Sequence, residues 1–517
     1  MSKKYLGIEF GSTRIKGCLI DEDYSVFATG GYEWENRFEN GYWTYSIDEI
    51  HKGLKQCFAD LKKNTELKTG EPLSSVEAIG ISGMMHGFLA FDKDGNLLTP
   101  FRTWRNTTTA QASKVLTELF GFNIPQRWSI SHLYQAILNN EPYVDKIAYI
   151  TTLAGYIHYL LTGKREMGIG EASGMFPVKD NDYDKEMLEK FRKLTAGKIT
   201  TDIYDMLPKV KVAGDGDTYL TEEGAKLLDV TGTLASGIPM CAPEGDAGTG
   251  MVATNAVERG TGNVSAGTSV FSMLVLKEDL KNVYPEIDVV TTPDGSPVAM
   301  VHCNNCCGEL DAWVNMFGEF AGLAGLSLSK GDLYGLLYRN SEKGENDCGG
   351  VTSYNYLSGE HIVGVEKGSP MYFRNGSTKL TLADFMKSQL YSAIATLSIG
   401  MELLFDREHA QADKFLAHGG LFKVEGVAQQ ILSNALNTPV SVMETAGEGG
   451  AWGMALLAAY MVEKQKLSLG EWLDQKVFAE IKVSTKTPDA DGVIGFKAYI
   501  KRYKVGLNAE KSLEEVF

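Results

Sequence analysis

The apolar positions of the chain form the same pattern twice, once near the N-terminus and once past its middle. Each copy predicts a strand, a turn of Gly followed by two hydroxyl residues, and a second strand. The first copy runs from Leu6 to Ile20 around Gly11-Ser12-Thr13, and the second runs from Gly260 to Leu276 around Gly267-Thr268-Ser269. A repeat of this kind indicates two halves that share one structural device.

Strand and helix periodicities alternate after the first copy. Val26–Thr29 extends the first pair of strands into a three-stranded meander. The capping-box pattern Ser46-Ile47-Asp48-Glu49 then begins a helix whose apolar face packs on the sheet. Val76–Ser82 returns as a strand, and residues 110–163 are mostly helical. This alternation predicts the α/β class.

The second half continues in the same manner. It predicts a long amphipathic helix, a buried strand, a helix, a strand and a helix of small residues, at Leu380–Phe405, Lys414–Ala417, Val424–Leu436, Val440–Val442 and Gly449–Tyr460. A chain of 517 residues exceeds what one core usually serves, so two domains of about 250 residues are expected. We place their boundary at Pro243, which gives domains 1–243 and 244–517.

The overall charge limits the partners. A net charge of −16 argues against nucleic acid and against an anionic membrane. The sequence shows no run of 18 apolar residues and no signal-peptide pattern, so we expect a cytoplasmic protein.

Seven cysteines indicate reduced thiols. His302-Cys303 with Cys306-Cys307 looks like a metal cluster, but a second ligand pair is missing and buried thiols are favoured.

The two turns have the composition of a phosphate site. A tight turn of Gly and two hydroxyl residues leaves N–H and O–H groups at its tip that suit phosphate oxygens. Neither turn opens a helix directly, which argues against a dinucleotide fingerprint and against a Walker A loop. The alternative is two ordinary hairpins.

Polar residues also follow a strand of the first half. His86 stands at the end of the strand Val76–Ser82, and Trp104, Arg105 and Asn106 come soon after it. Because ligands of open α/β sheets collect outside the carboxyl ends of strands, these residues could line a cleft for a polar small molecule. A capped loop with a satisfied histidine is the competing interpretation.

Two further segments have a structural and a functional interpretation. Asp246 lies among small residues in Glu244–Met251, at the start of a helix, where it is either an N-cap or a carboxylate that faces a cleft. Gly419-Gly420 follow a buried strand and either seat a nucleobase or ribose, or permit a close strand–helix crossing.

Taken together, these segments resemble the FGGY carbohydrate kinases, over nearly the whole chain and in the right order. The two turns resemble the family's phosphate loops, and Met85-His86-Gly87 with Trp104 is similar to the sugar-binding stretch of the xylulokinase branch. The segments Glu244–Ala247, His418–Gly420 and Tyr356–Glu360 resemble its catalytic-Asp segment, its adenosine motif and a further family segment. The resemblance implies two duplicated actin-like (ribonuclease H-like) domains with a central cleft.

It also implies an enzyme that transfers phosphate from ATP to a small sugar, a ketose such as xylulose or a polyol. Asp246 would be the general base, and Glu9 and Asp246 would hold Mg²⁺. ATP would be bound by Gly11, Ser12, Thr13, Gly267, Thr268, Ser269, Gly419 and Gly420, and the sugar by Met85, His86, Trp104, Asn106 and Asp246. The implied partners are the sugar and ATP, with neither nucleic acid nor membrane, and a homodimer is compatible with them.

Three positions depart from the family pattern. Glu9 stands where the family usually has Asp, and Asn106 stands roughly where relatives carry acidic residues that contact the sugar. His361–Val365 lacks the usual Arg-Thr-Pro continuation. Two alternatives remain: an actin-like ATP-binding chaperone or regulator, against which Asp246 and His86 argue, and a catalytically silent sugar sensor, which Glu9 alone keeps open.

Overall fold

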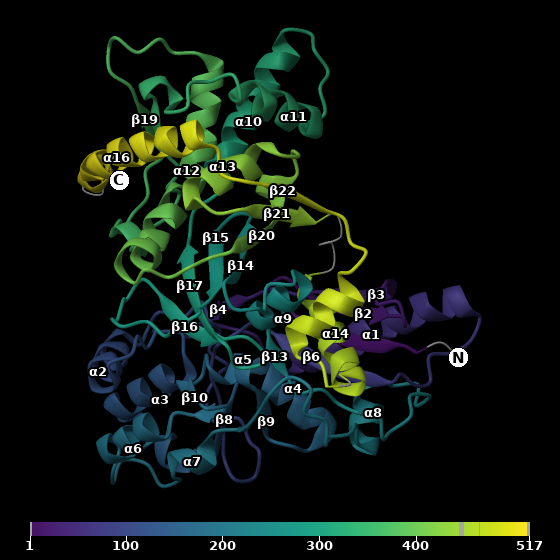
Figure 1. Ribbon diagram of the computed structural model, residues 1–517. Coiled ribbons are helices and arrows are strands. Elements are labelled where there is room, and N and C mark those ends of the chain that lie inside the picture. Colours follow the sequence, from purple (N-terminus) through teal and green to yellow (C-terminus); the bar gives the residue numbers. More distant parts are fainter. Residues whose placement is uncertain (1–2, 444–448, 465, 514–517) are drawn as a thin grey trace. The chain divides into compact units, whose positions relative to one another are not determined.

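The computed structural model describes residues 3–443, 449–464 and 466–513, and the chain divides into two compact units (Figure 1). Unit 1 comprises Met1–Glu258, Asp288–Val298 and Ala446–Glu480. Unit 2 comprises Arg259–Ile287, Ala299–Thr445 and Ile481–Phe517. The division differs from the boundary expected at Pro243, because residues 244–258 and a segment close to the C-terminus belong to unit 1.

The central sheet of unit 1 has the strand order β13-β6-β1-β2-β3. These strands are β1 (Tyr5–Phe10), β2 (Arg14–Ile20), β3 (Val26–Glu33), β6 (Ala78–Gly83) and β13 (Glu244–Gly245). Strand β1 is antiparallel to β2 and parallel to β6, and β13 is parallel to β6. The sheet therefore contains the predicted meander and adds two parallel strands from distant parts of the sequence.

Two helices cover the opposite faces of this sheet. Gly7 and Gly17 point to opposite faces, since Gly7 lies opposite Cys18 in the β1–β2 ladder. A Cβ atom at Gly17 would contact α1 (Ile47–Thr69), whereas one at Gly7 would overlap the backbone of α14 (Gly449–Glu463). Helix α14 also packs on α9 (Asp246–Ala253). This packing explains why both α9 and α14 belong to unit 1.

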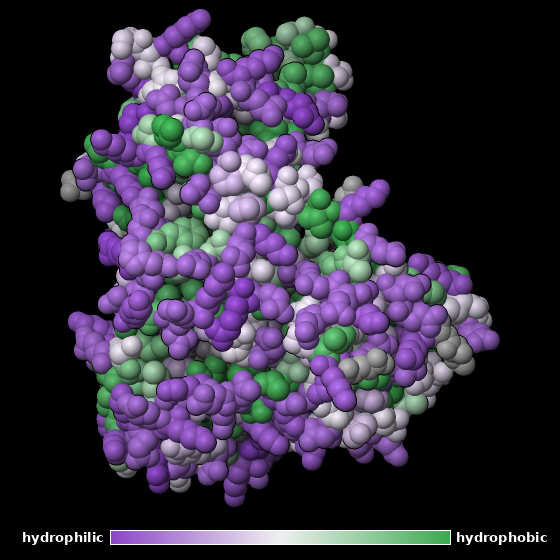
Figure 2. All heavy atoms as spheres, in the orientation of Figure 1, coloured by the Kyte–Doolittle hydropathy of each residue, from purple (hydrophilic) through white to green (hydrophobic). Residues whose placement is uncertain are grey.

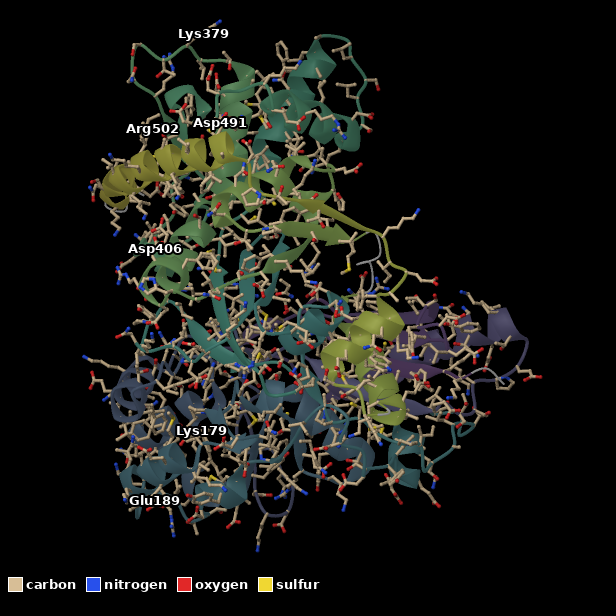
Figure 3. The ribbon with its side chains drawn as sticks, in the orientation of Figure 1. Lys179, Glu189, Lys379, Asp406, Asp491 and Arg502 are labelled. Carbon is tan, nitrogen blue, oxygen red and sulfur yellow. The ribbon has the colours of Figure 1, made fainter. Side chains whose placement is uncertain are left out.

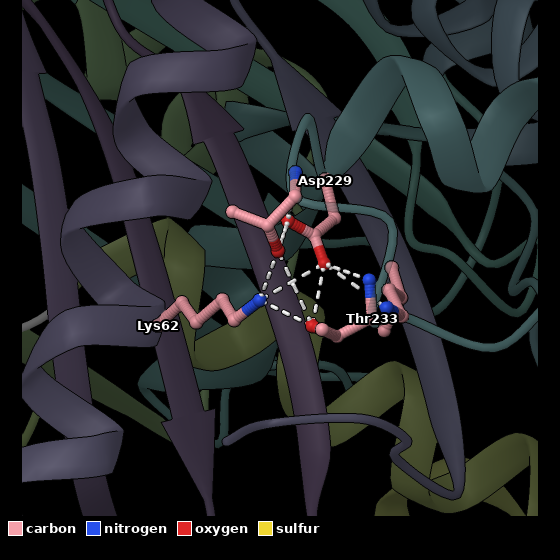
Figure 4. A network of polar contacts seen from close by, with 5 residues as sticks. Lys62, Asp229 and Thr233 are labelled. Carbon is pink, nitrogen blue, oxygen red and sulfur yellow. Dashed lines mark hydrogen bonds and ion pairs between the residues drawn. The ribbon is translucent and has the colours of Figure 1, made fainter.

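A buried ion pair connects α1 to the loop after α8 (Glu222–Leu228) in unit 1 (Figure 4). Lys62 Nζ lies 3.0 Å from Asp229 Oδ2 and also donates to the hydroxyls of Thr231 and Thr233. Both charged side chains are buried. Burial acts to raise the pKa of Asp229, but hydrogen bonds from Thr231 and Lys62 outweigh it and hold that pKa well below its usual range.

The remaining elements of unit 1 form smaller layers around this core; Figure 3 labels Lys179 and Glu189 in this part of the chain. They are β4 (Arg37–Glu39), β5 (Tyr42–Thr44), β7 (Leu89–Phe91), α2 (Ala110–Phe120), α3 (Ser129–Leu138), β8 (Tyr149–Thr151), α4 (Leu153–Thr162), β9 (Glu166–Gly168), α5 (Ile169–Ala172), β10 (Val178–Lys179), β11 (Asp182–Tyr183), α6 (Lys185–Leu194), α7 (Ile203–Met206), β12 (Lys209–Lys211) and α15 (Leu469–Trp472). Strand β16 (Asp288–Thr291) also belongs to unit 1 but is not part of these smaller layers. Strand β7 pairs with β8 and stands outside the central sheet.

Unit 2 repeats the arrangement of the first sheet. Its strands lie in the order β17 (Pro297–Cys303), β15 (Val270–Val275), β14 (Thr261–Ala266), β20 (Lys414–His418), β21 (Val440–Met443) and β22 (Val483–Lys486). Strand β14 is antiparallel to β15 and parallel to β20, as β1 is antiparallel to β2 and parallel to β6. The duplicated sequence pattern therefore corresponds to a duplicated sheet.

Helices and a two-stranded sheet complete unit 2. They are α10 (Gly308–Leu323), α11 (Lys330–Ser341), β18 (Thr352–Tyr354), β19 (Met371–Phe373), α12 (Leu382–Glu402), α13 (Val427–Leu436) and α16 (Ala490–Leu513). Most of α12 is buried. On α16, the Arg502 guanidinium (Figure 3) lies 2.8 Å from Asp347 Oδ2. Among the described residues, helices with the length and apolarity needed to cross a bilayer are absent.

Candidate active site

Three parallel strands of unit 1 end side by side. In register, Glu9 of β1 lies beside Ser82 of β6, and Ser82 lies beside Glu244 of β13. The residues that follow each strand therefore emerge at one edge of the sheet, where open α/β folds bind ligands. This edge brings together Glu9, the segment Met84–Gly87 and Asp246.

Asp246 is the first residue of α9, and its carboxylate does not cap that helix. The N-cap residue is Gly245, and this helix start has no capping hydrogen bond from a side chain. Instead, Asp246 Oδ1 accepts the N–H of Met85 at 3.0 Å. Burial raises the pKa of Asp246 above its usual range. Hydrogen bonds from backbone N–H groups partly offset this rise, and the bond from Met85 has the largest effect among them. A positioned carboxylate with a raised pKa suits a general base.

Glu9 lies close enough to Asp246 for the two charges to interact. Burial, and then the charge of Asp246, raise the pKa of Glu9 to about 7, while Lys16 acts in the opposite direction. Glu9 Oε2 accepts the N–H of Ala451 at 3.1 Å, and a Cβ atom at Gly450 would lie only 2.7 Å from Glu9 Oε1. Two neighbouring carboxylates favour the binding of a cation.

The carboxylate pair fits Mg²⁺ bound together with phosphates. Mg²⁺ usually keeps several waters and takes one or two carboxylates plus substrate phosphates. Within the part of the chain that the structure describes, no group of three or more His, Cys, Asp or Glu side chains could hold a metal ion. The geometry therefore fits a shared ion better than a cage made only of protein ligands.

His86 is held as a neutral imidazole. Its φ of 71° is in the left-handed region, its ring stacks on Trp128 at 6.2 Å, and its Nδ1 lies 3.2 Å from the carbonyl oxygen of Gly174. Because a carbonyl oxygen only accepts, Nδ1 carries the hydrogen and Nε2 is an acceptor. Burial, with the nearby charge of Arg127, lowers the pKa of His86 well below its usual range.

The first turn offers amide donors at its tip. The carbonyl oxygen of Gly11 accepts from Trp34 Nε1 at 2.7 Å, and that of Ser12 accepts from the Tyr45 hydroxyl at 2.5 Å. Within residues 3–443, 449–464 and 466–513, the N–H groups of Ser12 and Thr13 have no hydrogen-bond partner. Donors of this kind suit an anion.

Trp104 belongs to the same region of unit 1, because its Nε1 donates to Ser12 Oγ at 3.3 Å. Asn106 has a different environment. It is buried, its Oδ1 accepts from Trp43 N–H, and its Nδ2 donates to the carbonyl oxygens of Trp43 and Thr103. Both amide donors are used, so this geometry favours a structural clamp over the sugar contact expected from the sequence. Arg105 stacks over Trp43 at 3.9 Å.

The second turn, in unit 2, is held in place by backbone hydrogen bonds to its carbonyl oxygens. The carbonyl oxygens of Gly267 and Thr268 accept the N–H groups of Cys307 and Cys306, at 3.0 and 2.9 Å. Among the described residues, the N–H groups of Thr268 and Ser269 have no partner. A Cβ atom at Gly267 would meet nothing within 4 Å. The thiol groups of this region are free cysteines, as expected from the sequence.

Gly419 is required by packing, whereas Gly420 is not. Strands β14 and β20 run in parallel register, with Ser265 beside His418, so Gly419 emerges next to the second turn. Its φ is 107°, and a Cβ atom there would overlap the carbonyl of Ala266. At Gly420 a Cβ atom would meet nothing within 4 Å. The close contact at Gly419 is therefore with the end of the neighbouring strand β14 and not with a helix, and open space lies beside Gly420.

Two residues near this edge of unit 1 carry no recognisable sequence signal. Arg127 pairs with Asp288 and acts on the charge of His86. Glu171 is fully buried against Gly245, its carboxyl oxygens have no hydrogen-bond partner within the described chain, and burial raises its pKa well above the usual range. Only the position of Glu171 in the Gly-rich loop 168–177 could have drawn attention to it.

The repeated sheet, with a Gly-hydroxyl turn after the first strand of each copy, defines a duplicated actin-like ATPase fold. The chain belongs to the FGGY family of carbohydrate kinases. The model of the family's N-terminal domain matches residues 4–253, and the model of its C-terminal domain matches residues 262–462. The protein is therefore a carbohydrate kinase, and kinases of this family use ATP as phosphoryl donor.

Individual relatives are distant. The chain is 22% identical over 464 residues to the xylulose kinase of Haemophilus influenzae, which covers 86% of this chain and 89% of that kinase. It is 23% identical over 291 residues to the glycerol kinase of Thermococcus kodakarensis, covering 53% of this chain and 54% of that one. The fold is similar to that of a ligand-bound xylulose kinase from Lactobacillus acidophilus, with a TM-score of 0.79 at 17% identity over 98% of both chains. A gluconate kinase from the same organism gives 0.79 at 16% identity over 100% of both chains.

Proposed function

We propose that this kinase phosphorylates a small sugar, a ketose such as xylulose or a polyol, with Asp246 as general base. The observation that carries the proposal is the Asp246 carboxylate, which the Met85 N–H positions at the strand edge and which caps no helix. The similarity to a xylulose kinase over most of the chain supports a ketose, and the shorter match to a glycerol kinase supports a polyol as the second choice.

The transfer would proceed at one hydroxyl of the sugar. The Asp246 carboxylate takes the hydroxyl proton while the sugar oxygen forms a bond to the γ-phosphorus of ATP. The bond from that phosphorus to the β-γ bridging oxygen breaks, and ADP leaves with the electron pair. His86 Nε2 accepts a hydrogen bond from another hydroxyl, and the partly exposed Trp104 ring offers an apolar surface to the sugar.

ATP would be bound by the two turns and by Gly420. The N–H groups of Ser12 and Thr13 in unit 1, and of Thr268 and Ser269 in unit 2, donate to phosphate oxygens. Gly11 and Gly267 let those oxygens approach the backbone, and Gly420 leaves space beside the turn in unit 2 for the adenosine. Glu9 and Asp246 would hold Mg²⁺, which neutralises charge on the phosphates when bound.

The test is ADP release by the purified protein with ATP, Mg²⁺ and a panel of pentuloses, hexuloses and polyols. We expect release that depends on one sugar. Asp246→Asn keeps the side-chain shape and removes its basicity, so turnover should fall by about 10²- to 10⁴-fold. The melting temperature should stay near that of the wild type, and the sugar should still raise it.

Three results would contradict the proposal. Near-normal turnover of Asp246→Asn would remove Asp246 as the base. Sugar-independent ADP release would indicate an ATPase switch, whereas sugar binding without any release would indicate a sensor.

A further inference from the structure

Two adjacent cysteines of unit 2, Cys306 and Cys307, have their thiol groups in direct contact. Their sulfur atoms lie 3.6 Å apart, within hydrogen-bond distance for sulfur. All seven cysteines lie in the described part of the chain as free thiols, and six of them are buried. Cys307 is the partly exposed one, so a reagent in solution can reach it. The pair therefore combines an accessible thiol with a second thiol beside it.

The backbone of the same pair holds the second turn in place. The N–H of Cys306 donates to the carbonyl oxygen of Thr268 at 2.9 Å, and that of Cys307 donates to the carbonyl oxygen of Gly267 at 3.0 Å. The carbonyl oxygen of Cys306 accepts from Asn355 Nδ2 at 2.9 Å. The peptide group between the two cysteines is therefore fixed at both its carbonyl and its N–H. Any rotation of this peptide group breaks a contact to the turn.

A disulfide between adjacent cysteines requires such a rotation. The Cα atoms of neighbouring residues are about 3.8 Å apart across a trans peptide bond. Ordinary disulfides join Cα atoms that are roughly 4.4–6.8 Å apart. The small ring that two adjacent cysteines form is therefore strained, and strained disulfides are the easily reduced ones, which serve regulation more than stability.

The surface around Cys307 determines which disulfide reagent can react there. Glu309 and Asp311 follow this cysteine in the first turn of α10 and place negative charge near its thiol. In Figure 2, hydrophobic atoms gather at the top of the view, over the helices α10 and α11 of Figure 1. An anionic disulfide such as that of glutathione is repelled by the two carboxylates, whereas an uncharged disulfide is not.

We propose that Cys306 and Cys307 are a reversible thiol modification site, at which an uncharged small-molecule disulfide joins the two sulfur atoms and thereby releases the second turn. The Cys307 thiolate attacks one sulfur of the reagent, forms a mixed disulfide and expels one small thiolate. The Cys306 thiolate then attacks the Cys307 sulfur and expels the other. The two protein thiols lose two electrons and two protons, and the reagent takes them up as two small thiols.

The order of the two steps follows from the environment of Cys306. The hydrogen bond with Cys307, followed by burial and by the charge of Cys307, raises the pKa of Cys306 well above its usual range. Cys306 is therefore a protonated thiol in the reduced protein, and Cys307 reacts first. Formation of the mixed disulfide removes the thiolate charge of Cys307 and the hydrogen bond to that thiolate. Cys306 then loses its proton more easily and can complete the ring.

The first test needs no nucleotide. The purified protein is incubated with 2-hydroxyethyl disulfide, digested and analysed by mass spectrometry. We expect the peptide that carries Cys306 and Cys307 to have lost two hydrogen atoms without keeping an adduct. Amide hydrogen exchange of residues 265–269 and 304–308 should become faster in the oxidised protein, because the N–H groups of the two cysteines lose their acceptors. Dithiothreitol should reverse both changes.

The consequence for ATP rests on the proposed role of the second turn in binding phosphate. Oxidation should raise the ATP dissociation constant by at least about tenfold, because the displaced turn no longer presents its N–H groups to phosphate oxygens. Gly267→Val is the reference in the same titration. If that variant binds ATP weakly but oxidation has no effect, release of the turn is refuted. If neither change affects ATP, the turn does not bind phosphate, and the modification site is still supported by the peptide mass and the hydrogen exchange.

Three variants separate ring closure from a simple adduct. Cys307→Ser should not react with the reagent. Cys306→Ser should keep a mixed disulfide on Cys307 and retain slow exchange at the turn, because its backbone N–H groups are unchanged. Cys303→Ala is the matched control, since it removes a nearby buried thiol and leaves the pair intact, so it should respond as the wild type does. A disulfide between Cys303 and Cys306, a wild type that stops at the mixed disulfide, or a ring that leaves the exchange unchanged would overturn the proposal.

Discussion

The glycines of unit 2 that lie near the second turn have opposite structural requirements. Gly419 has a φ of 107° and lies against the carbonyl of Ala266, so any side chain there strains the backbone and overlaps its neighbour. Gly267 has an open Cβ position. A side chain at Gly267 is therefore compatible with the fold and interferes only with a ligand that approaches the backbone.

This contrast gives a prediction for two variants. Gly267→Val should lower ATP affinity by at least about tenfold, because a branched side chain occupies the space that a phosphate oxygen needs. Its melting temperature should stay close to that of the wild type. Gly419→Val should instead lower the melting temperature strongly, by the mechanism of strain at a special backbone conformation. Nucleotide titration and thermal unfolding measure the two effects.

Gly420→Ala is the control for the second variant, since its Cβ position is open and the fold should tolerate it. Unchanged ATP affinity in a folded Gly267→Val protein would reduce the second turn to an ordinary hairpin. A Gly419→Val protein as stable as the wild type would show that the close contact with Ala266 can relax.

At the residue scale, residues at the carboxyl ends of strands could be predicted from the sequence. The rule that ligands collect at the carboxyl ends of strands predicted the position of His86, whereas Asp246 was singled out among small residues at the start of a helix and its role was implied by the family resemblance. Arg127 could not be found in this way, because it comes close to His86 only through tertiary packing. Asn106 follows the predicted sugar-binding stretch in sequence, but its amide bonds to the backbone of Trp43 and Thr103.

At the scale of elements, strands and helices with strong periodicity were predictable. The long helix expected at Leu380–Phe405 is α12, and the buried strand expected at Lys414–Ala417 is β20. Partners of strands were less predictable. Phe88–Phe91 has the composition of a strand of the main sheet, yet β7 pairs with β8, because which strands meet depends on the path of the chain after them.

The ion pair between α1 and the loop after α8 allows a prediction at this scale. Asp229→Ala removes the partner of Lys62 and the acceptor for the N–H groups of Thr231, Thr233 and Leu234. Loss of one member of a buried pair costs about 3–5 kcal/mol. Lys62→Met should cost less, because the carboxylate keeps its backbone and hydroxyl donors.

Chemical denaturation of both variants measures this order. The double variant Lys62→Met, Asp229→Ala completes the cycle, and we expect it to be less destabilised than the sum of the single changes, because the two residues interact directly. A Lys62→Met protein less stable than Asp229→Ala would mean that the cation contributes more than the backbone donors do.

At the scale of the whole molecule, the repeated turns predicted two similar halves, and the two sheets show the repetition. The division of the chain into units was not predictable, because α14 returns to unit 1 between β21 and β22, two strands of the second sheet. Its small residues show that something packs closely on it. Only the structure shows that the close neighbour is Gly7 of β1, more than four hundred residues earlier.

Buried carboxyl groups in both units give the whole molecule a predicted dependence on pH. Burial is the largest cause that raises the pKa of Glu9 and Glu360 to about 7 and that of Glu244 to about 8. In the unfolded chain these groups have their usual pKa near 4.5, so the folded state binds protons more tightly. Their stabilisation is complete below about pH 4.5 and is lost as pH rises through 7 to 8. The melting temperature should therefore fall between about pH 7 and pH 8.5, where buried histidines with a lowered pKa, such as His86 and His132, are neutral in the folded and the unfolded chain and no longer change the stability.

Glu360→Gln separates the contribution of one such group from the rest. Glu360 Oε2 accepts the N–H groups of Asn304 and Asn305, and a glutamine oxygen can accept both bonds without titrating. The pKa shift of Glu360 corresponds to at most about 3 kcal/mol between the ends of the pH range. The variant should match the wild type near pH 5, exceed its melting temperature above pH 8 and show a shallower slope between them. The measurement needs buffer without Mg²⁺ and nucleotide, because a cation at Glu9 and Asp246 would lower the pKa of Glu9 and change the slope through unit 1. An unchanged slope in the Glu360→Gln protein would show that Glu360 is already ionised in the folded chain at neutral pH.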